Sequence, residues 1–155
     1  MKSMVRGVLA VLAGFVVASL VMVVVESLNG RVFYPGLAKQ AEGVTDRETI
    51  RQILASAPVG ALVVVLVGWA LGSLLGGMLA ARIGKSSPVR HTLALGVVLT
   101  LAGIANNLML PPPMWFRIAG LLVFVPAAYL GSRLVASATR SVPAVVSRDG
   151  GSGRN

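Results

Sequence analysis

A chain of 155 residues in which 55% are hydrophobic and only 12% are charged is too apolar for a soluble domain, where about 25% of residues carry charge. The absence of cysteine and the single histidine exclude disulfide exchange, thiolate chemistry and histidine-rich metal or haem sites within one chain. The net charge of +9 lies at the ends of apolar segments and in the tails, so we expect a lipid bilayer as the partner and no nucleic acid.

Four apolar segments are each long enough to cross a bilayer core, which needs about 20 helical residues. We predict transmembrane helices over 4–28, 58–81, 92–110 and 115–137, and therefore an all-α, polytopic, up-down bundle of four helices. The first segment begins like a secretory signal, but it is longer than a signal core of about 7–15 residues, so a retained anchor is expected and a cleaved signal is the alternative. Pro126 predicts a kink in the fourth helix.

The longest connection, residues 29–57, is expected outside the membrane. It opens on two turn signals, Asn29-Gly30 and Tyr34-Pro35-Gly36, so the first helix should end before them. The segment Thr45-Asp46-Arg47-Glu48 then has the spacing of a capping box, which predicts a short amphipathic helix near 46–56. This helix is expected to return the chain to the bilayer along its surface or across the bundle mouth; a cap that grips a ligand is the alternative.

Positive charges orient the four helices in the membrane. Nine Lys and Arg residues lie on one side, two before residue 7, three between 82 and 90 and four after 132, against five on the other side. The side richer in these residues is normally cytoplasmic, so both termini are expected in the cytoplasm. Residues 141–155 are rich in Gly, Ser and Pro and predict a disordered cytoplasmic tail after a transmembrane domain of residues 1–140.

Small residues recur every four positions in the second predicted helix. Such rows let two helix backbones approach closely, which stabilises helix pairs in lipid. We expect packing within the chain, with contact to another subunit as the alternative, and the first helix has a weaker row that is a plausible partner. The rows are Gly68, Gly72, Gly76 and Ala80; Ser73, Gly77 and Ala81; and, in the first helix, Ala10, Gly14 and Ala18.

Glu26 is the only acidic residue inside or next to a predicted span. It is placed about two residues from the outer helix end, at the level of Asn106, Asn107 and Arg117, with which it is expected to form a polar cluster at the outer rim. We expect a clasp that ties helix ends together; a proton or cation site is the alternative, because a carboxylate within a membrane is a functional candidate.

The remaining distinctive side chains have structural interpretations. Trp115 follows three consecutive prolines and fits the aromatic belt at the membrane interface, where it would anchor a rigid turn. Trp69 falls near mid-bilayer and is expected to fill space beside the glycine rows, with contact to a pigment or quinone ring as the alternative. His91, beside Arg90, is expected to contact lipid headgroups.

The order of several motifs resembles a group of small bacterial inner-membrane proteins with four helices. The resemblance covers roughly residues 4–137 and implies that architecture and a bacterial inner-membrane location, but no activity. With four short helices and a first-helix glutamate, the chain is also similar in outline to small multidrug-resistance transporters. It departs from them because their glutamate lies in mid-membrane, whereas Glu26 is expected at the rim, and because they lack a long external loop. The residues that carry the first resemblance are Glu26, Tyr34-Pro35, Gly68-Trp69-Ala70, Gly76-Gly77, Ala80-Ala81-Arg82, Ala102-Gly103-Ile104-Ala105-Asn106, Pro111 to Phe116 and Pro126-Ala127-Ala128.

These features predict a structural or accessory membrane protein that packs against other transmembrane helices or against itself, without a cofactor or bound metal. No nucleophile and base are expected at one depth, so the chain is not expected to be an enzyme. A small oligomeric transporter or channel is the alternative.

The predicted topology is tested by single cysteines, because the chain contains none of its own. A membrane-impermeant thiol reagent should label positions 40 and 112 from outside intact cells, and positions 86 and 145 only after the cells are opened. Labelling of position 86 from outside would contradict the orientation.

Overall fold

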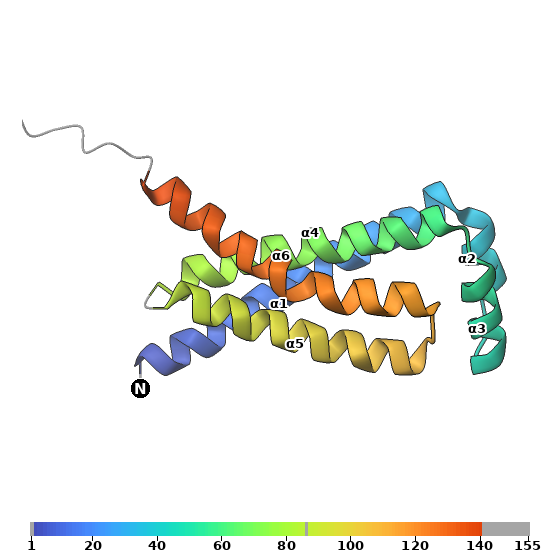
Figure 1. Ribbon diagram of the computed structural model, residues 1–155, viewed down its shortest axis with the longest axis horizontal. Helices are drawn as coiled ribbons and strands as arrows, with labels where there is room; N and C mark the ends of the chain where they lie inside the picture. Colours follow the sequence, from blue (N-terminus) through green and yellow to red (C-terminus); the bar gives the residue numbers. More distant parts are fainter. Residues whose placement is uncertain (1, 86, 141–155) are drawn as a thin grey trace, which may run out of the picture.

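The computed structural model describes residues 2–85 and 87–140, and within them every regular element is helical. Four helices are long and apolar enough to cross a membrane, as the sequence predicts. Figure 1 shows them side by side, with the N-terminus and the α4–α5 connection at one end and the α5–α6 connection at the other. The predicted tail, 141–155, lies outside the described residues. The four are α1 (Lys2–Leu28), α4 (Val59–Ile83), α5 (Pro88–Met109) and α6 (Met114–Arg140).

Helix α1 ends at Leu28, as expected, but the chain does not turn away at Asn29-Gly30. The chain continues through a π-helical turn, η1 (Asn29–Phe33), whose last bond runs from the Tyr34 N–H to the Asn29 carbonyl at 2.7 Å. Asn29 is buried and its side-chain amide donates to the Ala61 carbonyl at 3.0 Å, near the start of α4. This contact between helices outweighs the local preference of Asn-Gly for a turn.

Two short helices follow η1 before α4 begins. They are α2 (Pro35–Ala41), which the sequence did not predict, and α3 (Arg47–Ser56), which lies where a short helix was expected. Pro35 starts α2 because its fixed φ suits the first helical turn and its missing N–H is not needed there. Figure 1 places both at the end of the bundle opposite the N-terminus.

The backbones of α4 and α1 are in contact along the row Gly68, Gly72, Gly76 and Ala80 of α4. A Cβ added at Gly72 would lie 2.7 Å from the Ala18 carbonyl oxygen, and one added at Gly14 would lie 2.8 Å from the Gly76 carbonyl oxygen. Ala10 and Ala18 are wholly buried. Small side chains on both helices therefore let the two backbones approach within van der Waals contact.

The second row of α4 faces α6 instead. Ser73, Gly77 and Ala81 are buried, and a Cβ added at Gly77 would lie 2.8 Å from the Cα of Ala128. Gly131 of α6 makes a second close contact with α4, since a Cβ added there would lie 2.8 Å from the Met78 backbone nitrogen. Both rows of α4 are thus occupied by helices of the same chain.

Helix α6 is continuous but changes direction near its middle, as Figure 1 shows. Pro126 lies inside the helix, where it lacks the N–H that would bond to the Leu122 carbonyl and its ring crowds that carbonyl. In the half of α6 before Pro126, Phe116 and Phe124 pack against Trp69 of α4 and Leu99 of α5 in the hydrophobic core.

Replacing either glycine of the α1–α4 contact with leucine should destabilise the fold. The side chain of Gly72→Leu or Gly76→Leu has no space to enter, and overpacking costs about 1–3 kcal/mol. Thermal unfolding of the purified protein in detergent measures the loss. Gly36→Leu is the matched control, because a side chain at Gly36 meets nothing within 4 Å. Equal melting temperatures for all three variants would contradict the packing.

Candidate functional site

The carboxylate of Glu26 is bonded to a buried indole. The Trp69 Nε1–H donates to a Glu26 carboxylate oxygen at 2.9 Å. Trp69 is 5% exposed, and its ring is stacked on Phe124 at a centroid distance of 5.3 Å and meets Phe116 edge-on at 5.1 Å. A Cβ added at Gly120 would come within 3.0 Å of the indole Cε3, so this glycine makes room for the ring.

Glu26 lies deeper along the helices than the sequence predicts. Because α1 continues through η1 to Phe33, Glu26 is seven residues, or about 10 Å, from the end of the helical segment instead of two residues. Its neighbour Val25 packs on Gly68, nine residues and about 14 Å inside the start of α4. Glu26 therefore lies farther from the outer end of the helices than a residue at the rim would.

A cavity of about 280 Å³ opens beside Glu26, between α1 and α5. Phe15 and Met22 of α1, Leu99 of α5 and Phe124 of α6 give it apolar walls, and its polar groups come from Ser19, Glu26 and Asn106. The site is an apolar groove with one carboxylate at its edge, the kind of surface that recognises a ligand by shape and a single charge.

The predicted rim cluster is only partly brought together. Glu26 and Asn106 line the same cavity, but Arg117 turns back to the proline turn, where its Nε donates to the Pro112 carbonyl at 3.0 Å. Among the described residues the one ion pair within 4 Å is Arg51–Glu48, so Glu26 and Arg117 do not form one. Glu26 instead accepts from Trp69 of α4, and Arg117 bonds within its own turn.

Asn107 follows Asn106 on α5 but does not line the cavity beside Glu26. It is 7% exposed, and both atoms of its amide are buried without a hydrogen-bond partner among the described residues. It is therefore not part of a satisfied clasp with Glu26. Trp115 is 41% exposed on the first turn of α6, edge-on to Phe116 at 5.9 Å, and its anchoring role stays a prediction.

Trp69 fills space, although against different neighbours than expected. It packs on Phe116 and Phe124 of α6, and its Nε1–H also donates to Glu26. The signal was present in the register, because pairing the small-residue rows of α1 and α4 in antiparallel order brings Glu26 within reach of Trp69. No group of three His, Asp or Glu side chains gathers as a metal site among the described residues.

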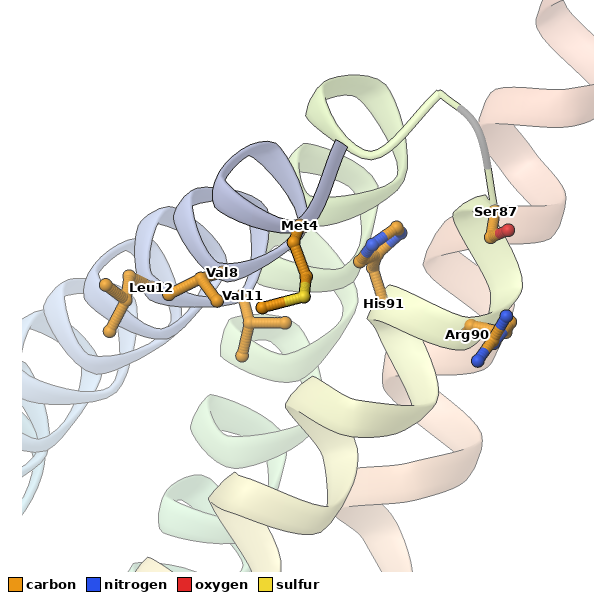
Figure 2. Close-up of a pocket in the computed structure, with 8 residues that line it drawn as sticks. Met4, Val8, Val11, Leu12, Ser87, Arg90 and His91 are labelled. Carbon is orange, nitrogen blue, oxygen red and sulfur yellow. The ribbon is translucent and has the colours of Figure 1, made fainter. Parts of the chain in front are cut away.

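A second and larger cavity, about 670 Å³, lies at the opposite end of the bundle. Figure 2 shows it between the first turns of α1 and the first turn of α5, with His91 pointing between the helices. The imidazole occupies a slot between two glycines: a Cβ added at Gly7 would lie 2.6 Å from Nε2, and one at Gly84 would lie 2.8 Å from Cγ. Nearby, Arg6 Nε donates to the Ile83 carbonyl at 2.8 Å and closes the last turn of α4.

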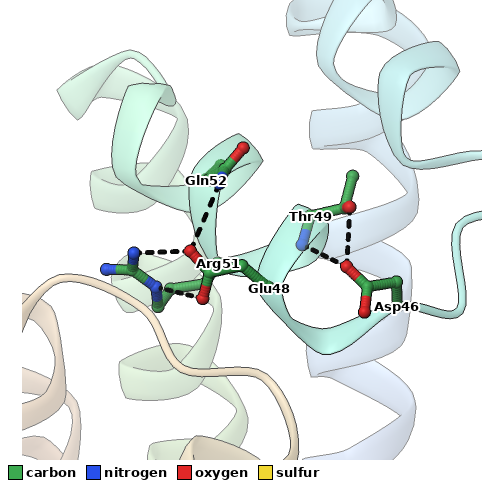
Figure 3. Close-up of polar contacts among 5 residues, drawn as sticks. All are labelled: Asp46, Glu48, Thr49, Arg51 and Gln52. Atoms are coloured by element: carbon green, nitrogen blue, oxygen red, sulfur yellow. Dashed lines mark hydrogen bonds and ion pairs between the residues drawn. The ribbon is translucent and has the colours of Figure 1, made fainter.

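Polar contacts in α3 hold that helix rather than a ligand (Figure 3). Its N-cap is Asp46, one residue later than the capping box predicts, and the Asp46 carboxylate accepts from the N–H of Thr49 at 2.8 Å and from its hydroxyl at 2.7 Å. The Thr49 hydroxyl lowers the pKa of Asp46. The pKa of Glu48 is lowered to about 2, mainly by two hydrogen bonds from Arg51 and to a smaller extent by one from Gln52.

The apolar side of α3 is half-buried and its polar side is exposed. Ile50, Ile53 and Leu54 are the half-buried residues, and Arg51 lines a small cavity with Arg117 and the three prolines of the α5–α6 turn. This helix therefore lies beside the proline turn at the end of the bundle. Its position relative to a membrane stays a prediction.

Comparison with models of protein families, with curated proteins and with solved structures found no match. The resemblance to small bacterial inner-membrane proteins therefore stays a prediction.

Glu26→Gln should keep the fold, because the amide oxygen still accepts the Trp69 N–H. Glu26→Leu leaves that buried N–H without an acceptor, which costs about 1–3 kcal/mol. In detergent, the melting temperature of Glu26→Gln should be higher than that of Glu26→Leu. Adding Trp69→Phe to Glu26→Leu should recover part of the lost stability, because it removes the N–H donor that has no acceptor. A leucine variant as stable as the glutamine variant would contradict the bond.

Helix α3 should lose structure in acid. Because the pKa of Glu48 is lowered from 4.5 to about 2, its stabilising contribution is complete above about pH 4.5 and is lost as the pH falls towards 2; the lowered pKa of Asp46 acts in the same direction. The Cα chemical shifts of α3 in detergent micelles, followed from pH 6 to pH 2, measure the loss. The variant Asp46→Asn with Glu48→Gln keeps hydrogen-bond acceptors without titrating, so its shifts should stay flat; a flat wild-type titration would contradict the assignment.

Proposed function

We propose that this protein is a structural or accessory component of a bacterial inner-membrane assembly. In this proposal both termini face the cytoplasm, and the chain packs against other transmembrane helices through the open side of α1. It carries no catalytic activity of its own.

The observation that carries the proposal is the open face of α1. Of the eighteen most apolar consecutive residues of α1, only 17% are buried, against 39% in α4. Helix α1 packs on α4 and to a lesser extent on α5, and it makes no comparable contact with α6. Its free side is a continuous aliphatic stripe, formed by Val5, Leu9, Leu12, Val16, Leu20 and Val23.

The spacing of this stripe suits contact with another helix. Its residues recur at intervals of three and four, the pattern that keeps one helix face against a partner over several turns. The small-residue rows are already used by α1, α4 and α6, so a partner would meet aliphatic side chains and not a glycine groove. In lipid such a contact is stabilised by side-chain packing.

The interior of the bundle also favours a packing role over transport by a single chain. The buried hydroxyls of Ser73, Thr92 and Ser132 each donate to a carbonyl of their own helix. Backbone and aromatic contacts fill the space between α1, α4 and α6. Transporters normally have a polar site or path near the midplane, and this interior offers little of one.

Gentle solubilisation followed by native mass measurement tests the proposal. The wild type should leave the membrane with stable larger chains that mass spectrometry identifies, and Leu20→Trp on the open face of α1 should release them. The matched control is Leu122→Trp on α6, since Leu20 is 60% and Leu122 67% exposed. A protein that runs alone, or variants that behave alike, would overturn the accessory role.

A small oligomeric transporter or channel is the second candidate, and the depth of Glu26 favours it. If a hydrocarbon core about 30 Å thick is centred on α4, which is about 37 Å long, the level of Val25 and Gly68 lies roughly 10 Å below the core surface. A carboxylate at that depth beside aromatic rings attracts an organic cation through charge and through the ring faces.

Flux measurements in liposomes separate the two candidates. A homo-oligomer that moves cationic solutes, and that stops when Glu26→Gln is introduced without loss of fold, would support transport and contradict the accessory role. Wild-type vesicles that move neither protons nor cationic solutes would remove the second candidate.

A further inference from the structure

The cavity between the first turns of α1 and α5 combines two kinds of lining. Met4, Val8, Val11 and Leu12 make an apolar strip along α1, and three of them are more than half exposed. The α5 side is polar and is formed by Ser87, Arg90 and His91 (Figure 2). An amphipathic ligand with a polar head at α5 and a chain along α1 fits this division.

Charge at this end of the molecule is positive without compensation. The acidic residues of the described chain, Glu26, Glu42, Asp46 and Glu48, all belong to the second half of α1 or to the segment before α4. Arg90 is exposed and has no hydrogen-bond or ion-pair partner among the described residues. Its guanidinium is therefore free to bind an anion from outside the chain.

The first turn of α5 adds hydrogen-bond donors to the same place. Its N-cap, Ser87, makes no side-chain cap bond, and Pro88 occupies the first helical position. The N–H groups of Val89 and Arg90 have no acceptor within the helix, and a helix N-terminus favours negative charge. Ser87 and Arg90, which line the cavity, belong to this helix start.

His91 gives the cavity a fixed wall. Its ring is held between Gly7 and Gly84, and its Nδ1 is buried without a partner among the described residues. Gly7 and His91 both line the cavity, so the embedded imidazole forms the end of the groove between α1 and α5.

We propose that this groove is a binding site for an anionic phospholipid. The phosphate is held by Arg90, Ser87 and the first turn of α5, and an acyl chain lies along Met4, Val8 and Leu12 of α1. The ligand is a lipid and not free phosphate, because the apolar strip continues directly from the polar end and both belong to helices apolar enough to span a bilayer.

Native mass spectrometry of the delipidated full chain tests the proposal. Phosphatidylglycerol should bind at one saturable site about tenfold more tightly than phosphatidylcholine with the same acyl chains. Both lipids carry the phosphate, but the choline ammonium of phosphatidylcholine brings a second positive charge to a site that already holds Arg90. Arg90→Gln should remove the preference. Arg82→Gln is the control, since it removes one exposed charge at the same end of the molecule but outside the cavity.

Two further measurements examine the lipid tail and the source of the phosphate. Val8→Trp, at a position 56% exposed, should weaken binding of both lipids without changing the melting temperature. Excess inorganic phosphate should not displace phosphatidylglycerol. Equal affinity for the two lipids, equal effects of the two arginine variants, no effect of Val8→Trp, or displacement by phosphate would each overturn the proposal.

Discussion

The architecture depends on backbone contact across both sides of α4. Gly72 and Gly76 meet the carbonyls of α1, while Gly77 meets Ala128 of α6. Lipid tails are as apolar as the side chains, so burial of apolar surface does not drive helices together as it does in water. Close approach supplies dispersion and weak Cα–H···O contacts instead, and only residues without bulk permit it. The Glu26–Trp69 bond follows from the register that these contacts fix.

Much of the fold could be predicted because lipid imposes strict local rules. Uncharged segments of sufficient length identify α1, α4 and α5, whereas the 15 uncharged residues of α6 suffice only when Arg117 and Arg133 are included in the helix. Helix α3 is found from its turn and cap residues even though the cap is Asp46 and not Thr45. Small residues at a spacing of four identify the packing faces. These signals are carried by residues close together in the sequence, so no knowledge of neighbouring helices is needed.

The depth of Glu26 and the partner of Arg117 could not be predicted in the same way. Asn29-Gly30 locally favours a turn, but the Asn29 amide bonds to Ala61 and the helical segment continues through the π-helical turn η1 to Phe33. Arg117 finds the carbonyl of Pro112 in its own turn, which is closer than any carboxylate. In each case a contact that depends on three-dimensional position decides between choices of similar local energy. Aligning the rows Ala10-Gly14-Ala18 and Gly72-Gly76-Ala80 in antiparallel order would have revealed the Trp69 contact.

The order of the helices along the chain means that the α4 face formed by Ser73, Gly77 and Ala81 meets its partner late in synthesis. The partner of α4 on α1 is synthesised first and is available as soon as α4 enters the bilayer, whereas Ala128 of α6 follows Gly77 by 51 residues. At ribosomal rates of about 5–20 residues per second, the glycine face of α4 is open for roughly 3–10 s. During that interval the nascent chain has an unfilled groove of a shape that suits any helix with small residues, including α6 of a neighbouring copy. The α6 of a second copy carries the same Ala128 and Gly131, so exchange of α6 between two chains would form the same contacts.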